Sequence, residues 1–210
     1  MLSIQTDFGE DYRRYFAKRF IELGGEVLSE DSSPIGDNDF RTEVFRIKKK
    51  SPDVVLLAHL GNTLGVLLRQ LKQQGVDAQF LGVYEAQELS VLNVAGDAAS
   101  GMIFFSPEPK ISSSYRIGFI QRFVQRYGYQ PSVLAANAYD TTILAAIALS
   151  ECRLDSNCAQ RFVLNANYDG VSGEFIVEAD GGVSREFVAK TVSHGEFVKF
   201  ELGANAHLAR

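Results

Sequence analysis

The sequence has no long apolar run and no strongly basic segment. None of its apolar runs approaches the roughly 20 residues that a membrane-spanning helix needs. The strongest basic cluster is Lys48-Lys49-Lys50 in a chain of formal net charge −5, whereas nucleic-acid-binding domains usually present a basic face. The triplet suits the end of a helix, where cations are favoured. These absences disfavour membrane-spanning and nucleic-acid-binding proteins.

Motifs of common enzyme classes are also missing. The sequence contains no Gly-x-Gly-x-x-Gly after a strand, no Walker loop and no Gly-x-Ser-x-Gly elbow. The histidines His59, His194 and His207 are scattered, and only His59 follows an expected strand. An enzyme is therefore disfavoured, and we expect no cofactor and no metal site.

The cysteines Cys152 and Cys158 flank a polar turn. They are either reduced structural thiols or a small-loop disulfide, and a disulfide requires an oxidising compartment. Their spacing matches no common zinc motif, and no histidine lies nearby to complete one.

Neither end of the sequence shows a targeting pattern. Residues 1–5 lead directly into Thr6-Asp7-Phe8-Gly9 without the features of a signal peptide. We expect either a cytoplasmic chain or one whose natural N-terminus was removed or never included. Residues 203–210 are expected to form a loose, disordered tail.

The most informative stretch covers residues 52–106. Short apolar runs alternate there with helical patterns, which predicts parallel strands joined by crossover helices. The sequence therefore predicts an α/β fold with a three-layer parallel-sheet lobe. Strands are expected at 54–58, 80–83 and 102–105, and helices at 60–74 and 86–95.

The segments on either side extend this pattern. Before residue 52 we expect strands at 2–6 and 26–29, a helix starting near Asp7, and a helix capped by Asn38 or Asp39 that ends in the lysines. After Pro107 we expect helices at 112–127, 131–150 and 157–165, a strand at 173–177 and a hairpin of 183–192 with 196–200. The predicted division is 2–106, 107–170 and 171–202.

Ligands of parallel sheets bind beyond the carboxyl ends of the strands. This rule selects candidate ligand-binding residues in the loops after the strands, namely Phe8, Gly9, His59, Leu60, Gly61, Asn62, Tyr84 and Glu85. Glu85 either pairs with a ligand ammonium or is a solvated loop carboxylate. Phe8 and Gly9 open a helix whose amides favour a polar ligand group, although Phe8 also suits a hydrophobic staple onto Tyr12.

In their order and spacing, several motifs resemble the type 1 periplasmic binding proteins, specifically the branched-chain amino-acid (Leu/Ile/Val) receptors of ABC transporters. No single motif is specific, but together they run through residues 5–200 in the family's order. They are Asp7-Phe8-Gly9, Asp37-x-Asp39-Phe40, Pro52-Asp53-Val54-Val55, Gln74-Gly75, Ala95-Gly96-Asp97-Ala98-Ala99-x-Gly101, Tyr139-Asp140, Gly170-Val171-x-Gly173-x-Phe175 and Asp180-x-Gly182.

The resemblance implies a two-lobed receptor that closes on a ligand and presents it to a membrane permease in the periplasm. It also implies that this chain lacks most of the first lobe, keeping the second lobe and the helices that return to the first. The site departs from the family, because Phe8 replaces an aromatic residue that is usually tyrosine, a frequent tyrosine falls on Leu60, and the acidic ammonium-binding residue falls on Tyr84 beside Glu85.

The resemblance leaves alternatives open. The chain is either a truncated solute-binding component, for which binding by the fragment alone is an open question, or a cytoplasmic small-molecule-sensing regulator of the same fold, which the missing signal sequence favours. The ligand is expected to be an amino acid or a related amide or acid. We also expect self-association, because Phe119, Phe123, Ile143 and Leu144 would otherwise be exposed on helices that lack their covering sheet.

Overall fold

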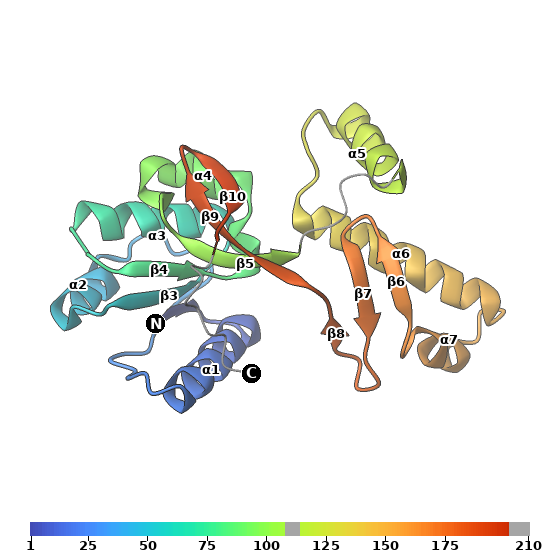
Figure 1. Ribbon diagram of the computed structural model, residues 1–210, viewed down its shortest axis with the longest axis horizontal. Helices are drawn as coiled ribbons and strands as arrows, with labels where there is room; N and C mark the ends of the chain where they lie inside the picture. Colours follow the sequence, from blue (N-terminus) through green and yellow to red (C-terminus); the bar gives the residue numbers. More distant parts are fainter. Residues whose placement is uncertain (108–113, 202–210) are drawn as a thin grey trace. The chain divides into compact units, whose positions relative to one another are not determined.

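The computed structural model describes residues 1–107 and 114–201. The chain forms two compact units. Unit 1 contains Met1–Ser106 and Ala189–Arg210, and unit 2 contains Pro107–Val188 (Figure 1). The expected tail at 203–210 and the first residues of the helix expected at 112 lie outside the described residues.

Unit 1 is built on a sheet whose strand order is β10-β9-β5-β4-β3-β1-β2. The pairs β1–β2, β1–β3, β3–β4 and β4–β5 are parallel, and β9–β10 is an antiparallel hairpin. Its strands are β1 (Leu2–Ile4), β2 (Asp31–Ser33), β3 (Val54–Ala58), β4 (Gln79–Gly82), β5 (Ile103–Pro107), β9 (Phe187–Ser193) and β10 (Glu196–Lys199). The predicted parallel α/β sheet is confirmed.

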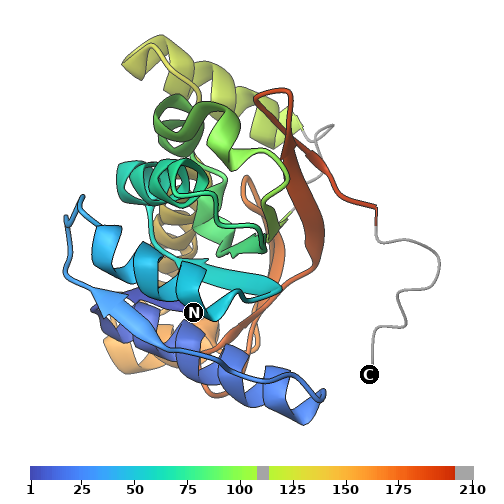
Figure 2. The same cartoon turned by 90° about the vertical axis from the view of Figure 1, so that its left-hand side faces the viewer.

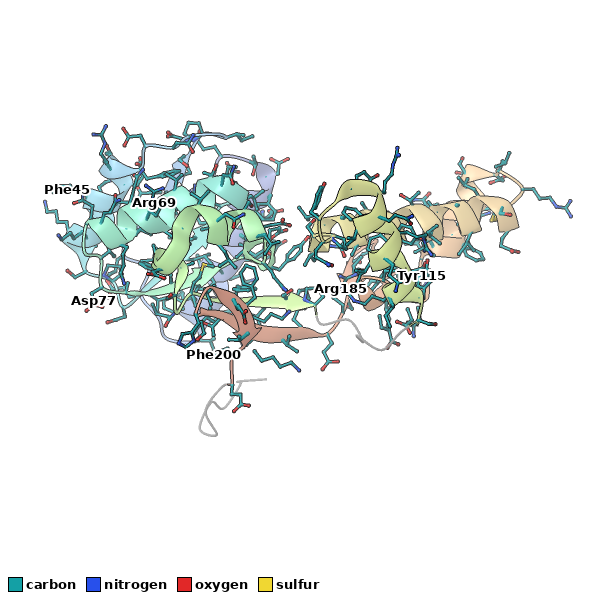
Figure 3. The ribbon with its side chains drawn as sticks, turned by 90° about the horizontal axis from the view of Figure 1, so that it is seen from above. Phe45, Arg69, Asp77, Tyr115, Arg185 and Phe200 are labelled. Carbon is teal, nitrogen blue, oxygen red and sulfur yellow. A yellow bond between two sulfur atoms is a disulfide. The ribbon has the colours of Figure 1, made fainter. Side chains whose placement is uncertain are left out.

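Helices cover this sheet on both faces (Figures 1 and 2). They are α1 (Asp7–Glu22), α2 (Arg41–Lys50), α3 (Gly61–Gln73) and α4 (Leu89–Ala95), with short 3-10 turns at Tyr84–Ala86 and Gly96–Ala99. Leu64, Leu67, Leu68 and Leu71 recur at helical spacing along α3 and are fully buried. Phe45 of α2 and Arg69 of α3 lie on the outer, exposed side of their helices (Figure 3).

Two expected boundaries in unit 1 are wrong for physical reasons. The strand expected at 26–29 does not form, and the polar segment Asp31–Ser33 pairs with β1 instead. The helix expected from Asn38 starts at Arg41, because the N–H of the buried Phe40 donates to Gln70 Oε1 at 2.8 Å. The N–H of Phe40 is therefore satisfied from α3, while Oδ1 of Asp39, one of the two expected capping residues, accepts the N–H of Arg41 at 3.3 Å.

A third boundary also differs. The helix expected at 86–95 is interrupted, with a 3-10 turn at Tyr84–Ala86 followed by α4 from Leu89. Residues 87 and 88 separate the two elements, so the loop after β4 is longer than the sequence predicted.

Unit 2 combines helices with a small antiparallel sheet. Its helices are α5 (Ser114–Tyr127), α6 (Val133–Glu151) and α7 (Ser156–Val163), and its strands are β6 (Asn167–Gly170), β7 (Gly173–Val177) and β8 (Val183–Ser184). The order β6-β7-β8 is antiparallel throughout. Helix α7 lies close to the range 157–165 that the sequence predicted.

Helix α6 corrects the expectation that no segment is long enough to span a membrane. By length and composition alone, its 19 residues meet that criterion. Its central residue Asp140 is buried, however, and accepts the backbone N–H groups of Val171 and Ser172 at 2.9 and 2.7 Å. This polar contact is characteristic of a helix folded within unit 2.

The apolar residues expected on an exposed helix surface are largely covered. Phe119 packs with Ala136 and Val171, and Leu144 packs with Phe175 and Val177, so both are buried within unit 2. Phe123 and Ile143 are partly exposed. The exposed apolar residues of these helices include Ile117, Leu134 and Ile147.

Candidate functional site

Three loops of unit 1 follow adjacent parallel strands. The order β4-β3-β1 places the segments after Gly82, Ala58 and Ile4 at the same edge of the sheet. These loops contain every candidate ligand-binding residue named from the sequence. The carboxyl edge of a parallel sheet is the usual ligand-binding edge of such folds.

The loop after β1 forms the N-terminus of α1. Thr6 caps this helix, since its Oγ1 accepts the N–H of Gly9 at 3.2 Å. Gly9 is buried, and a Cβ atom there would lie 2.0 Å from the carbonyl oxygen of Ile4. The absence of a side chain therefore lets α1 start directly against the end of β1.

Phe8 packs against a neighbouring ring and is also partly exposed at the surface. Its ring lies 4.9 Å from that of Tyr12, one helical turn later. Phe8 remains partly exposed, so the contact with Tyr12 orients the ring without removing it from solvent. An apolar part of a ligand could therefore still contact Phe8.

His59 differs from the other candidates because it is fully buried. Its Nε2 lies 2.9 Å from Ser33 Oγ, and its ring meets Phe40 edge-on at 5.4 Å. Burial lowers the pKa of His59 to about 4, so the imidazole is neutral near pH 7. In this structure His59 supports the loop from inside and is not exposed to a ligand.

The residues after His59 reach the surface at the N-terminus of α3. Leu60 is 37% exposed and Asn62 is exposed. Gly61 has φ +48°, in the left-handed region. No side chain caps this helix, so its first amides are available to a negatively charged or polar group.

Glu85 is the most unusual residue of the candidate site. Its side chain is 6% exposed, and among the described residues its Oε2 atom has no hydrogen-bond partner. Burial is the main cause of a raised pKa of its carboxyl group, and the nearby charge of Glu88 raises that pKa further. A buried carboxylate oxygen without a partner is costly unless a ligand or ion satisfies it.

Tyr12 connects the first loop to the third. Burial and the adjacent Glu85 carboxylate raise the pKa of Tyr12 to about 12. Phe8, Tyr12 and Glu85 thus form a chain of neighbours from α1 to the loop after β4. The sequence had indicated Tyr12 only as part of the apolar spacing of α1 and as a possible partner of Phe8, which placed it near the site.

Gln87 is a second residue that the sequence did not indicate. Its Oε1 atom accepts hydrogen bonds from Ser106 Oγ at 2.6 Å and from Lys190 Nζ at 3.0 Å. Its partners are 19 and 103 residues away in the chain. A local sequence pattern cannot indicate contacts between residues so far apart in the chain.

A hollow of about 330 Å³ lies at the opposite edge of the sheet. It is lined by the residues around Gly25 and Val27 and by the start of β3 at Pro52 to Val55. Apolar residues that were expected to form a strand therefore line a depression. Because ligands of parallel sheets bind at the carboxyl edge, we do not place the site in this hollow.

The two cysteines lie in unit 2, away from these loops in the sequence. Cys152 and Cys158 are joined in a disulfide between the end of α6 and α7. Cys152 packs with Ala148 and Ala159. The disulfide therefore holds the turn between two helices.

Unit 1 is a parallel α/β lobe whose candidate site lies in the loops at the carboxyl edge of its sheet. The family model described as "Periplasmic binding protein" matches residues 1–195. The chain belongs to the periplasmic binding protein family, and the relatives that it resembles include type 1 members named for branched-chain amino acids. This confirms the resemblance inferred from the sequence motifs.

The curated relatives carry names that refer to branched-chain amino acids. The "Leu/Ile/Val-binding protein" of Citrobacter freundii is 30% identical over 104 residues, which are 50% of this chain and 28% of that protein. The "Leu/Ile/Val-binding protein homolog 1" of Brucella abortus (strain 2308) is 25% identical over 136 residues, 64% of this chain and 36% of that protein. The matched segments thus span about a third of the relatives' lengths.

Solved structures share the fold. A leucine-binding protein, LivK, from Thermotoga maritima superposes with a TM-score of 0.78 at 20% identity, covering 95% of this chain and 59% of that one. A solute-binding protein from R. palustris, solved in complex with benzoate, gives 0.81 at 18% identity, covering 94% and 56%. At these identities the likeness establishes the fold alone.

Proposed function

We propose that this chain forms part of the solute-binding component of an ABC-type amino-acid transport system. The family to which it belongs is a solute-binding, non-enzymatic one, and we propose the same of this chain. The proposed ligand is an amino acid of the branched-chain type, bound at the carboxyl edge of the unit 1 sheet. The proposed partner is a membrane permease.

The observation that supports this proposal is the buried carboxylate of Glu85, whose Oε2 atom has no hydrogen-bond partner among the described residues. A ligand ammonium placed against Oε2 would supply the missing hydrogen bonds and the opposite charge. The N-terminus of α3, which no side chain caps, favours a negatively charged group such as the carboxylate of the ligand. A zwitterion carries both groups, so an amino acid suits this edge of the sheet.

The surrounding residues favour an apolar ligand side chain. Phe8 and Leu60 present partly exposed apolar surface in adjacent loops. Phe8 and Leu60 occupy positions where the resemblance implies tyrosines, so two hydroxyl groups are absent from the proposed site. The ligand is therefore an aliphatic amino acid or a less polar relative of one.

An aromatic carboxylate is the competing ligand, because the R. palustris protein of the same fold was solved with benzoate. Benzoate carries no cation to satisfy Glu85, and its negative charge would be repelled by that carboxylate. The buried Glu85 therefore favours an amine-bearing ligand over benzoate.

We also propose that the chain acts in the periplasm and that it binds weakly alone. The disulfide between Cys152 and Cys158 supports an oxidising compartment. The chain spans 59% of the length of the Thermotoga structure, and in a relative of full length the part that this chain does not span would supply further contacts to the ligand. A cytoplasmic regulator of the same fold remains the alternative proposal, and a homo-oligomer remains a prediction that light scattering of the purified chain would test.

Calorimetric titration of the chain with L-leucine, L-isoleucine and benzoate tests the ligand proposal. We expect L-leucine or L-isoleucine to bind more tightly than benzoate. Glu85→Gln keeps the size of the side chain but removes its charge, and should weaken amino-acid binding about 10- to 100-fold, the usual effect of losing a charge-assisted hydrogen bond. Affinity should also fall as the pH is lowered, because the carboxyl group must be ionised to pair with an ammonium.

The matched control is Glu151→Gln, which changes an exposed glutamate at the end of α6. It should leave binding unchanged. Equal affinity of wild type and Glu85→Gln for an amino acid would remove Glu85 from the site, and tighter binding of benzoate than of either amino acid would overturn the proposed ligand class.

A further inference from the structure

Gln87 occupies a junction between the candidate site and two strands of the sheet. It follows directly after the 3-10 turn that carries Tyr84 and Glu85, and its N–H donates to the carbonyl of Tyr84 at 3.3 Å. Its side chain reaches in the other direction, to Ser106 and Lys190. One residue therefore contacts both the turn of the site and the strands β5 and β9.

Strands β5 and β9 are the strands through which the chain leaves and re-enters unit 1. Unit 1 ends at Ser106 and resumes at Ala189, so β5 (Ile103–Pro107) and β9 (Phe187–Ser193) both contain a boundary between the units. The two strands are neighbours in the sheet. Any displacement of unit 2 relative to unit 1 must be accommodated by the backbone at these boundaries.

The two donors at this junction require an oxygen acceptor on the side chain of residue 87. A single atom, Gln87 Oε1, accepts from the hydroxyl of the fully buried Ser106 and from the ammonium of Lys190. The bond from Lys190 is charge-assisted and so stronger than one between neutral groups. Both donors lose this acceptor if residue 87 carries a hydrocarbon side chain.

We infer that Gln87 is a positioning residue that couples the state of the Glu85 turn to the two connecting strands. A ligand that pairs with Glu85 changes the preferred position of the turn at 84–86, and Gln87 transmits that change to Ser106 in β5 and Lys190 in β9. This inference rests on the proposed function for its ligand, but the coupling itself is a property of the free chain.

Hydrogen–deuterium exchange of the purified chain measures the coupling without a ligand. Glu85→Ala perturbs the turn, and Gln87→Leu removes the acceptor. In the wild-type background we expect Glu85→Ala to change amide exchange in residues 103–106 and 189–193 by about 2- to 10-fold, which corresponds to one hydrogen bond of ordinary net strength. In the Gln87→Leu background, Glu85→Ala should have no further effect there, so the two changes are non-additive.

A conservative variant separates positioning from simple loss of stability. Gln87→Glu retains an oxygen acceptor for Ser106 and Lys190, and should restore the response of both strands to Glu85→Ala. Gln73→Leu, at an exposed glutamine of α3, is the matched control and should leave the response intact. Additive effects of Glu85→Ala and Gln87→Leu, or failure of Gln87→Glu to restore the response, would overturn the inference.

The same variants titrated with L-leucine separate this inference from the proposed function. If L-leucine protects the turn and both strands in wild type but only the turn in Gln87→Leu, coupling and ligand are both supported. If L-leucine protects no segment of the wild type while the double-mutant cycle remains non-additive, the proposed ligand fails and the coupling stands. Equal protection of the strands in wild type and Gln87→Leu would overturn the coupling alone.

Discussion

Unit 1 and unit 2 bury their apolar side chains in different ways. The described core of unit 1 is one large continuous cluster that joins the sheet to helices α2, α3 and α4, from Leu2 and Leu57 in the strands to Leu68 in α3. In unit 2 the buried apolar residues fall into separate small clusters around Phe119, Leu144 and Ala148. In a continuous core, the packing of each residue depends on many others. Separate small clusters need further interactions to hold the elements of the unit together.

Polar and covalent links fill that role in unit 2. Asp140 of α6 holds the turn between β6 and β7 through the N–H groups of Val171 and Ser172. Arg185 lies 5.0 Å above the ring of Phe175 and donates to Asn137 Oδ1 at 3.1 Å (Figure 3). The disulfide joins the end of α6 to α7. The comparison predicts that unit 1 is most sensitive to cavities and unit 2 to loss of specific bonds.

The largest effect is expected from a cavity in unit 1. Leu68→Ala removes a fully buried side chain of α3 and should lower the free energy of unfolding of unit 1 by about 2 to 5 kcal/mol. Leu149→Ala, at a partly exposed leucine of α6, is the control and should cost much less. Urea unfolding followed by hydrogen exchange, read separately for each unit, makes the measurement. Similar losses for both substitutions would remove the distinction between the cores.

Acid should destabilise unit 1 through His59. Its pKa is lowered from 6.5 to about 4, mainly by burial, so folding favours the neutral ring. This stabilisation is complete above about pH 6.5 and is lost as the pH falls toward 4, a change on the order of 3 kcal/mol. His59→Gln should flatten the dependence of unit 1 stability on pH between these values.

The raised pKa of Glu85 acts in the opposite direction, because a buried carboxyl group favours folding when it is protonated. Glu85→Gln should therefore steepen the loss of stability as the pH falls. A wild-type curve that does not change between pH 6.5 and 4, with both variants identical to it, would contradict the assignment of either group as a buried titrating residue.

Loss of the Asp140 carboxylate should act on unit 2. Asp140→Leu leaves two buried backbone N–H groups without acceptors and should destabilise unit 2 by about 2 to 3 kcal/mol, with unit 1 unchanged. Asp140→Asn retains one acceptor and should cost less. Exchange rates of residues 167–177 report the effect, and an equal change in unit 1 would show that the two units unfold together.

Reduction of the disulfide should have the smallest effect. Its cysteines are 6 residues apart, and closing so short a loop contributes about 2 kcal/mol. Reducing agent should therefore loosen the end of α6 and α7 while unit 1, which holds no cysteine, keeps its stability. Circular dichroism melts with and without reductant check this, using Cys152→Ala with Cys158→Ala as the reference protein.

The candidate site was only partly visible in the sequence. Phe8, Leu60, Asn62 and Glu85 follow strands that the apolar pattern identified, so their position at one edge of the sheet could be predicted. The pattern could not show that the His59 ring turns inward, because the partner that makes this favourable is Ser33. It also could not identify Gln87, whose partners are distant in the chain.

The sequence by itself determined the parallel α/β fold. Continuous apolar runs such as 54–58 and the leucine spacing of α3 are local patterns, and each can bury its apolar side chains in only one type of secondary structure. The tertiary structure decided where marginal elements form. The polar strand Asp31–Ser33 is an edge strand that pairs on one side with β1, so it needs no continuous apolar run and leaves no apolar signal. The start of α2 likewise depends on Gln70, a residue of another helix. In both cases hydrogen bonds between distant residues outweighed local preference.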